Sequence, residues 1–483
     1  MSERRAFFGT LALGGAQVAK YALQFAVLPV LARILGPSAY GVVALAMPFI
    51  LFANMIADAG LGNALVRVQA PSRALQSTVF WLSAGMCAAL ALVIGLAAWP
   101  AGVVLHEPRL APVLWALSPI LLISGSLSVA NAAIMRERRF GVFALSDTVS
   151  AAVASGIAIG AALAGLGAWS LVIQQLTLWT IKGAWIQIAA RFLPSFECRP
   201  SLARPYIAFG LNAAASNVAD FFAKTAPQVI VGAFLGVAAV GRYALAFQLV
   251  RVPDAVISGP IYLAAFTAVA RLGDDHVAIQ ALTRRALRGV AMGLLPVFAG
   301  LALVADLAVQ LMLGPKWTAA APVMAVLCPA GFLLCYYSIV SAVLMGVGRA
   351  DLQLRLTLLG GAAMGGGALL GARFGDVWVG VGLSAGAILV GPAYLGVLAR
   401  ALQARAGAIV ADLAAPLAAT AAMSLCVVLA RAEATHWTVG AQFVLAVGAG
   451  ALSYAVVLAV LSGRKMLEDL QMVMPRAARA ELS

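Results

Sequence analysis

The stretch VGAQFVLAVGAGALSYAVVLAVL, residues 439–461, contains no charged side chain. A helix needs about 20 mostly apolar residues to cross the hydrocarbon core of a membrane, and this stretch meets that length. The pattern extends well beyond it, because hydrophobic residues make up 63% of the 483 residues and charged residues only 10%. A soluble globular chain is usually about one quarter charged. The sequence therefore predicts an integral membrane protein built from helices.

Working outward from this stretch, we predict about 14 transmembrane helices in an all-α fold. The first six cover residues 7–33, 40–65, 78–98, 110–135, 143–166 and 168–190. The next six cover residues 205–235, 240–270, 289–313, 319–345, 356–372 and 377–398, and the last two cover 413–430 and 439–461. The predicted organisation is an N-lobe of helices 1–6 (1–200), a C-lobe of helices 7–12 (201–402), helices 13 and 14 (403–462) and a cytoplasmic tail (463–483).

The distribution of positive charge predicts the orientation. The net charge of +14 comes from 32 Lys and Arg against 18 Asp and Glu. Cytoplasmic loops of membrane proteins carry an excess of Lys and Arg. With the N-terminus in the cytoplasm, 22 of the 32 basic residues fall on that side, six on the other and four within spans. Both termini are therefore expected in the cytoplasm. The charges lie between apolar runs without interleaved aromatic residues, so no nucleic-acid partner is expected.

Cysteine and glycine patterns give no sign of a metal or cofactor site. The five cysteines form no CxxC pair, and four of them lie in apolar runs, where the usual role is that of a small buried hydrophobe. Glycines recur between Gly361 and Gly375 without a following Gly-Lys-Ser/Thr, which excludes a phosphate loop. Their spacing instead favours close packing between helices.

The chain contains an internal repeat. Residues 34–46 and 234–246 share seven identical positions, including Gly36 with Gly236 and Gly41 with Gly241. A second similarity, at nearly the same offset, matches Arg139 with Arg349. The alternative is chance recurrence of small apolar residues. A repeat of six helices gives both copies the same orientation, and such parallel repeats place the transport path between the two lobes.

Polar side chains recur at helical spacing inside predicted helices 1 and 7. Spacings of three and four residues place them on one face of each helix, and the two stripes align at the repeat offset. Ionisable groups at membrane depth are costly and usually functional, so both stripes are predicted to line one hydrated cavity. The alternative is a local i,i+4 ion pair within helix 7. The residues are Gln17, Lys20 and Gln24 in helix 1, and Asn217, Asp220, Lys224 and Gln228 in helix 7.

Further charged residues lie within other predicted spans. Helix 8 carries Arg251 and Asp254, and Pro253 and Pro260 are expected to bend it. Asp58 lies in helix 2. Helix 6 carries Lys182, for which the alternative is a side chain that extends to the membrane surface.

Cations at membrane depth suit an anionic substrate. Lys20, Lys224 and Arg251 are predicted to hold a pyrophosphate group through charge-assisted hydrogen bonds. The Gln and Asn residues of the two stripes are predicted to bind sugars.

Several short motifs resemble Wzx-like oligosaccharide flippases. They occur in the expected order between about residues 9 and 398, and the family belongs to the multidrug/oligosaccharidyl-lipid/polysaccharide exporter superfamily. The motifs are Arg33-Ile34-Leu35-Gly36-Pro37 with Tyr40-Gly41, Asp58-Ala59-Gly60-Leu61-Gly62, Arg138-Arg139-Phe140, Gly167-Ala168-Trp169, Gly236 with Gly241 and Tyr243-Ala244-Leu245-Ala246, and Trp317-Thr318-Ala319-Ala320-Ala321-Pro322.

The resemblance implies two pseudo-symmetric six-helix lobes in a MATE-like V, two C-terminal helices and alternating access. It implies transfer of an undecaprenyl-pyrophosphate-linked oligosaccharide from the inner to the outer leaflet of a bacterial inner membrane, for surface polysaccharide such as O-antigen, capsule or exopolysaccharide. A polysaccharide polymerase is an expected partner. Coupling to H⁺ or Na⁺ is a further hypothesis, with Asp220, Asp254 and Asp58 as the carboxylates that would carry the ion.

Three alternatives stay open. A multidrug exporter or a lipid II exporter would share the fold. An integral-membrane glycosyltransferase or polymerase would need catalytic carboxylates and usually a sizeable outer loop, and neither is evident in the sequence. No enzymatic activity is therefore expected.

Overall fold

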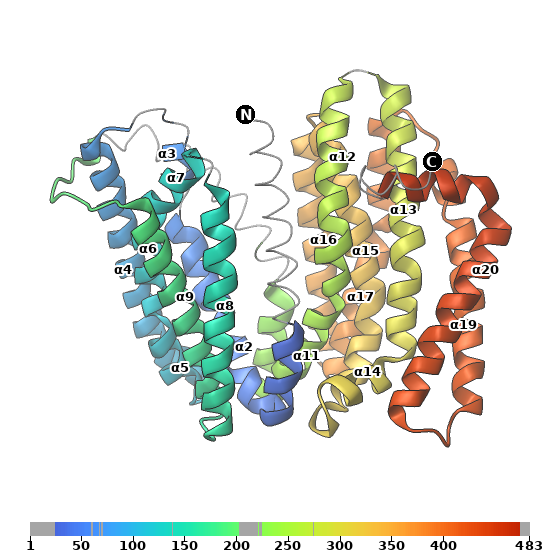
Figure 1. Ribbon diagram of the computed structural model, residues 1–483, viewed down its shortest axis with the longest axis horizontal. Helices are drawn as coiled ribbons and strands as arrows, with labels where there is room; N and C mark the ends of the chain where they lie inside the picture. Colours follow the sequence, from blue (N-terminus) through green and yellow to red (C-terminus); the bar gives the residue numbers. More distant parts are fainter. Residues whose placement is uncertain are drawn as a thin grey trace. The chain divides into compact units, whose positions relative to one another are not determined.

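The computed structural model of the chain, shown in Figure 1, describes residues 25–58, 61–66, 68, 71–137, 139–201, 221, 225–273 and 275–473. Within these ranges every regular element is a helix, which confirms the all-α prediction. Contacts divide the chain into two compact units, Met1–Gly241 and Arg242–Ser483, and each unit is described by itself.

The first unit consists of helices of very different lengths. The helical segments Phe25–Ile34 and Thr225–Leu235 are the described parts of predicted helices 1 and 7. The other elements are α2 (Pro37–Asp58), α3 (Leu61–Val66), α4 (Arg73–Val104), α5 (Leu110–Leu117), α6 (Pro119–Ser126), α7 (Ser128–Arg136), α8 (Phe140–Leu163), α9 (Ala168–Ala190) and the beginning of α11 (Val237–Val250).

The second unit continues from α11 to the end of the chain. Its elements are the π-helix η1 (Asp254–Ser258), α12 (Gly259–Leu272), α13 (His276–Leu303), α14 (Ala305–Met312), the short 3₁₀ helix η2 (Pro315–Trp317), α15 (Ala320–Gly346), α16 (Ala350–Gly371), α17 (Asp376–Ala401), α18 (Ala406–Ala411), α19 (Ala414–Glu433) and α20 (Val439–Val473).

The described part of the chain contains nine helices that are long and apolar enough to cross a membrane. A tenth span results if Leu110–Ser126 and Ser128–Arg136, which meet at a bend of 43°, count as one. The chain is therefore a multi-pass membrane protein. The number 14 stays a prediction. Parts of predicted helices 1 and 7 lie outside the described residues, α9 (the predicted sixth helix) is not among these spans, and the predicted eighth is divided into the shorter helices Val237–Val250 and Val256–Leu272.

Two predicted spans are interrupted. The fourth bends beside Ser126, whose hydroxyl donates to the carbonyl of Ile123 (2.6 Å). Such bonds from Ser to the preceding turn often bend helices. The eighth contains η1, which begins directly after Pro253, and Pro260 follows within the first turn of α12. Proline lacks the N–H that an α-helical ladder needs, so the interruption falls where the prolines predict it.

The predicted ninth span, residues 289–313, is wrong in its bounds. Its helix, α13, begins at His276, where the Asp275 carboxylate accepts a hydrogen bond from the N–H of Ala278 (3.0 Å). An N-cap of this kind can begin a helix in a polar segment, which hydropathy does not detect. The helix ends at Leu303, and a separate helix, α14, follows. Arg284, Arg285 and Arg288, which the hydropathy pattern places in a loop, therefore belong to α13.

Glycines allow a close approach of two helices in the second unit. A Cβ atom on Gly367 of α16 would overlap the carbonyl of Gly382 in α17, and one on Gly382 would overlap the carbonyl of Gly367. A Cβ on Gly371 would overlap the carbonyl of Trp378. Small residues let two backbones approach this closely, which confirms the close packing predicted from the glycine spacing.

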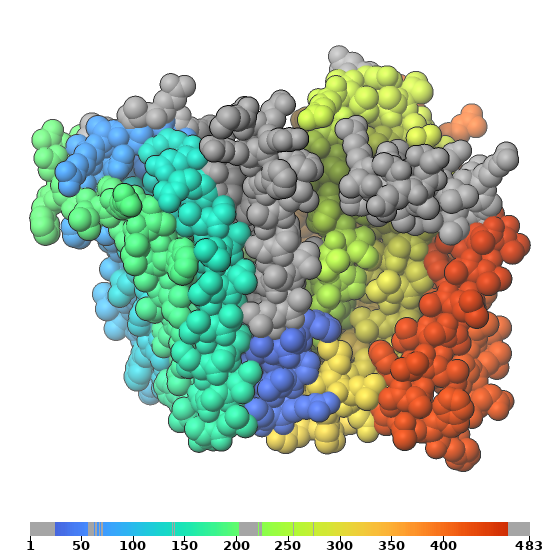
Figure 2. Space-filling model, viewed as in Figure 1, coloured from blue at the N-terminus to red at the C-terminus, as the bar shows by residue number. Residues whose placement is uncertain are grey.

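In the first unit, α8 and α9 pack along their length, and their side chains form adjacent columns in the space-filling view of Figure 2. In the second unit, α19 and α20 form a hairpin that packs on α13 through the buried side chains of Val304, Met423, Val427 and Ala446. The hydroxyl of Tyr454 in α20 also donates to the carbonyl of Met292 (2.7 Å). The C-terminal hairpin is therefore an integral part of its unit.

Candidate functional site

An ion pair lies inside the first unit, between α9 and α8. The Lys182 ammonium is 2.7 Å from the Asp147 carboxylate, and both side chains are largely buried. The same ammonium lies over the Trp179 ring, 5.8 Å from its centroid. Each residue lies about two turns inside its helix from the end where α8 begins and α9 ends, roughly 12 Å along the axis. The structure thus gives Lys182 a specific partner on a neighbouring helix.

Two further polar contacts tie α2 to its neighbours in this unit. The Gln228 amide donates to the backbone carbonyl of Ala44. The Ser124 hydroxyl of α6 lies 2.8 Å from Asn54 Oδ1. Gln228, predicted to bind sugar, is therefore engaged with the α2 backbone in this conformation.

The two copies of the repeated motif meet at the beginning of α2 and α11. A Cβ on Gly41 would overlap the carbonyl of Val237, and a Cβ on Gly241 would overlap the carbonyl of Pro37. Residue 237 is the repeat equivalent of residue 37, so the two contacts are reciprocal.

A salt bridge holds the beginning of α2 in place. Arg109 donates to both carboxylate oxygens of Glu107, at 2.6 and 3.0 Å, and to the Ser38 hydroxyl at 2.8 Å. These hydrogen bonds favour the charged carboxylate and hold the pKa of Glu107 below its ordinary value, although burial acts in the opposite direction.

In the second unit, Arg251 and Asp254 lie at the interruption between α11 and α12. Their closest N–O distance is 3.7 Å, and the two side chains are 51% and 33% exposed. Arg251 also lies near the Phe247 ring, 5.9 Å from its centroid. The structure therefore brings together a predicted pyrophosphate ligand and a predicted ion-coupling carboxylate, as a loose and partly exposed pair.

The π-helix presents further polar groups beside this pair. Ser258 ends η1 with its hydroxyl buried, and the Cys335 thiol of α15 lies close to both Ser258 and Asp254. A π-helical turn inside an α-helix is rare and often marks a functional site. Two carboxylate oxygens, a hydroxyl and a guanidinium could exchange a proton or bind a small cation and an anion side by side.

Other arginines of the second unit are tightly paired. Arg242 in α11 binds Asp376 at the start of α17 (2.6 Å), and Arg284 in α13 binds both carboxylate oxygens of Asp412 (2.6 and 2.9 Å). Arg431 in α19 binds Asp306 (2.6 Å). These pairs connect helices and leave those cations less available for a ligand than Arg251.

Most residues of the two predicted stripes lie outside the described part of the chain. Asp58 ends α2, but its side chain is outside the described residues, as are all of Gln17, Lys20, Gln24, Asn217, Asp220 and Lys224. Their place in a shared cavity stays a prediction.

Sequence reasoning missed the pairing of Lys182 with Asp147 and the contribution of Ser258 and Cys335. In each case the two residues lie on different helices, and no local spacing relates them. The pair of prolines around η1 was the one local signal of an unusual backbone.

Comparison with known proteins adds a family assignment. The profile of a family described as "Polysaccharide biosynthesis protein" matches residues 30–322. Similar curated proteins include the succinoglycan biosynthesis transport protein ExoT of Rhizobium meliloti, 27% identical over 74% of this chain and 72% of that protein. The lipopolysaccharide biosynthesis protein WzxC of Escherichia coli is 24% identical over 68% and 67%. The teichuronic acid biosynthesis protein TuaB of Bacillus subtilis is 25% identical over 84% and 85%.

Solved structures with the same fold include the lipid II flippase MurJ in an inward closed conformation. It superimposes with a TM-score of 0.76 over 95% of this chain and all of that one, at 12% identity. An inward-facing multidrug resistance MATE transporter of the MOP superfamily gives a TM-score of 0.61 over 80% of this chain and 96% of that one, at 14% identity. These similarities confirm the predicted fold class.

Proposed function

The chain belongs to the polysaccharide biosynthesis protein family, and from that premise we propose that it is a flippase for a lipid-linked oligosaccharide. Its substrate would be an undecaprenyl-pyrophosphate-linked repeat unit, carried from the cytoplasmic to the periplasmic leaflet of a bacterial inner membrane. The observation that carries the proposal is that relatives named for transport or synthesis of surface polysaccharides each align with two thirds or more of the chain.

The chemistry of the site supports an anionic substrate. Arg251 lies between the apolar helices α11 and α12, within the predicted eighth span, and its guanidinium is half exposed and only loosely paired. A charge within a membrane span is costly unless a partner compensates it. A pyrophosphate would supply that partner through short, charge-assisted hydrogen bonds. Lys20 and Lys224 would act with Arg251, and Gln17, Gln24, Asn217 and Gln228 would bind the sugars.

The Arg251–Asp254 pair suggests how binding is linked to a coupling ion. A pyrophosphate that binds Arg251 would displace Asp254 from it. The released Asp254 carboxylate would then bind H⁺ or Na⁺. Asp220 and Asp58 are the other candidate carboxylates. Outward movement of negative charge is itself favoured by an inside-negative potential, by about 2.3 kcal/mol per charge per 100 mV. The substrate would be released after alternating access exposes the site to the other side.

A multidrug exporter is the second candidate, because a MATE transporter shares the fold. A site for cationic drugs would need available carboxylates. Asp147 and Asp254, the acidic residues described inside the helices that form these sites, each face a cation. This arrangement favours an anionic substrate. The relative ExoT is named a transport protein, which supports transport over a glycosyltransferase or polymerase activity.

A deletion strain tests the proposal in the cell. Loss of the gene is expected to trap lipid-linked repeat units on the cytoplasmic leaflet, where a periplasmic glycan-modifying probe does not reach them. Complementation with the wild-type gene should restore both labelling and surface polysaccharide, and a multidrug exporter of the same fold serves as the control. Normal periplasmic labelling of repeat units in the deletion strain, with no second transporter of the family present, would overturn the proposal.

A further inference from the structure

Two basic hollows lie at matching ends of two helical hairpins, one in each unit. The hairpin α16–α17 carries a hollow of about 250 Å³, lined by Arg349, Leu352, Val397, Arg400 and Ala401. The hairpin α8–α9 carries a hollow of about 320 Å³, lined by Gln187, Ile188, Arg191, Phe192 and Leu193. Each lies where the first helix of its hairpin begins and the second ends.

In the second unit, two guanidinium groups converge on the hollow. Arg349 precedes the first residue of α16, and Arg400 lies in the last turn of α17. Arg349 uses its Nε to bind Asp351 (3.2 Å), so its two Nη groups stay available. The hollow also lies at the beginning of a 22-residue helix, where the backbone dipole favours an anion.

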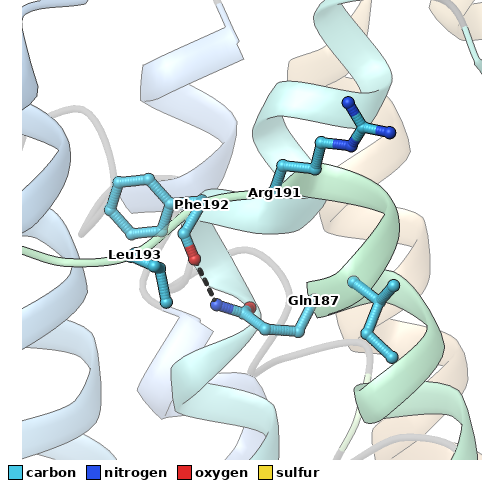
Figure 3. Close-up of a pocket in the computed structure, with 5 residues that line it drawn as sticks. Gln187, Arg191, Phe192 and Leu193 are labelled. Carbon is cyan, nitrogen blue, oxygen red and sulfur yellow. Dashed lines mark hydrogen bonds between the residues drawn. The ribbon is translucent and has the colours of Figure 1, made fainter.

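In the first unit, the end of α9 is shaped by a left-handed residue. Arg191 has φ 51°, ψ 30°, and the Gln187 side chain donates to the carbonyl of Phe192 (2.8 Å), as Figure 3 shows. Arg139 reaches the same end of α9 by donating to the carbonyl of Ala189 (3.0 Å). Arg191 therefore lines the hollow, and Arg139, which also pairs with Glu137 (3.2 Å), lies beside it.

The beginnings of α8 and α16, beside the two hollows, are equivalent in the repeat. Arg139 and Arg349 both precede the first residue of a helix, with φ, ψ of −84°, 52° and −95°, 53°. Their backbone N–H groups donate to the carbonyls of Ile134 and Leu344, which are equivalent to each other at the same offset. Arg191 and Arg400 close the equivalent second helices. The backbone geometry is shared at Arg139 and Arg349, whereas Arg191 is a left-handed C-cap and Arg400 lies inside the last turn of α17. Arginines at the same end of both hairpins point to a binding role beyond a general excess of positive charge.

We propose that each hollow binds the phosphodiester headgroup of an anionic phospholipid. Basic hollows between transmembrane helices suit such headgroups. The apolar side chains on the rim favour a lipid over a free phosphate. Ile188 and Leu193 are 76% and 75% exposed, and the acyl chains of a bound lipid would cover these apolar side chains. The loop charges assign this end of both hairpins to the cytoplasm, so the ligand would come from the cytoplasmic leaflet. The proposal does not depend on which substrate is transported.

Native mass spectrometry of the purified full chain in neutral detergent tests it. Phosphatidylglycerol and phosphatidylethanolamine are offered at equal concentration. The wild type is expected to retain two phosphatidylglycerol molecules in preference. R349Q/R400Q and R139Q/R191Q should each retain one, and the combined variant should lose at least fivefold of its binding. R373Q removes an exposed arginine from the other end of the α16–α17 hairpin and should bind like the wild type.

Equal retention of the two lipids by the wild type would overturn the proposal, whatever the variants do. So would unchanged phosphatidylglycerol binding in the combined variant, or an equal loss in R373Q. Millimolar glycerol phosphate should not displace the lipid, and displacement would assign the hollows to soluble phosphates instead. Thermal unfolding of each lipid-free variant should match that of the wild type. A loss of lipid binding can then be attributed to the substituted arginines and not to a less stable fold.

Discussion

Gly41 and Gly241 occupy equivalent positions in the internal repeat, and each lies against the backbone of the other's helix. A Cβ on Gly41 would come within 3.0 Å of the N atom of Gly241, and one on Gly241 within 3.2 Å of the N atom of Gly41. Because their other contacts, to Val237 and Pro37, are also repeat equivalents of each other, the crossing of α2 and α11 has local two-fold symmetry. This is the geometry of an isologous contact, here within one chain.

Substitution at the crossing should therefore be costly. Gly41→Ala or Gly241→Ala places a methyl group against a rigid carbonyl, and the backbones must separate. Overpacking of this kind costs about 1–3 kcal/mol. We expect a lower thermal midpoint, measured as the monodisperse fraction after heating. Gly36→Ala is the matched control, since nothing lies within 4 Å of a Cβ there. Equal midpoints for all three variants would contradict the close contact.

The α16–α17 hairpin makes a similar prediction at a second place. Gly382→Ala should force the two helices apart, because its Cβ would overlap the carbonyl of Gly367. We expect a loss of stability of about 1–3 kcal/mol. Gly366→Ala, one residue away from Gly367 in open space, should be nearly neutral or slightly stabilising, because alanine favours helices. The comparison fails if Gly366→Ala is the more damaging change.

The Lys182–Asp147 pair predicts strong coupling between two residues. Lys182→Met leaves the Asp147 carboxylate without that cation in a largely buried position, which should destabilise the protein by about 1–3 kcal/mol. The double variant Lys182→Met/Asp147→Asn should recover much of that loss, since no charge is then unmatched. A double-mutant cycle on thermal unfolding measures the coupling. Additive effects would mean that the pair contributes nothing.

Acid should weaken the salt bridge at the beginning of α2. The pKa of Glu107 is lowered in the folded protein, so the folded state binds fewer protons than the unfolded state around the ordinary value of 4.5. The stabilisation is therefore present at neutral pH and is lost as the pH falls below about 4.5. We expect the thermal midpoint to fall less steeply between pH 5 and pH 3 in Glu107→Gln and Arg109→Gln than in the wild type. Parallel curves for all three proteins would contradict this contribution.

The fold class could be predicted from the sequence because apolar length and charge position directly reflect the membrane. The family resemblance, read from short motifs such as those around Gly36 and Gly236, is confirmed by the family match over residues 30–322. The first and last residues of individual helices were predicted less accurately. Hydropathy locates the apolar part of α13, whereas the Asp275 cap decides that the helix begins at His276.

The site was predicted less completely, for a physical reason. Periodicity finds residues that share a face of one helix, as Arg251 and Asp254 do. It does not find partners on separate helices, such as Lys182 with Asp147 or Arg242 with Asp376. Gln228 illustrates the same limit, because its spacing predicts a cavity-facing amide and its actual partner is the α2 backbone.

The central claim is that cations at membrane depth carry a pyrophosphate-linked oligosaccharide between leaflets. The most direct measurement is the rate at which labelled lipid-linked oligosaccharide changes leaflet in vesicles that contain the purified protein. The wild type should move the lipid, and Arg251→Gln, Lys20→Ala and Lys224→Ala should each be at least tenfold slower, a loss of about 1.4 kcal/mol or more. Arg373→Gln, an exposed arginine outside the site, should keep the wild-type rate. Movement no faster than in empty vesicles, or wild-type rates in all three site variants, would contradict the account.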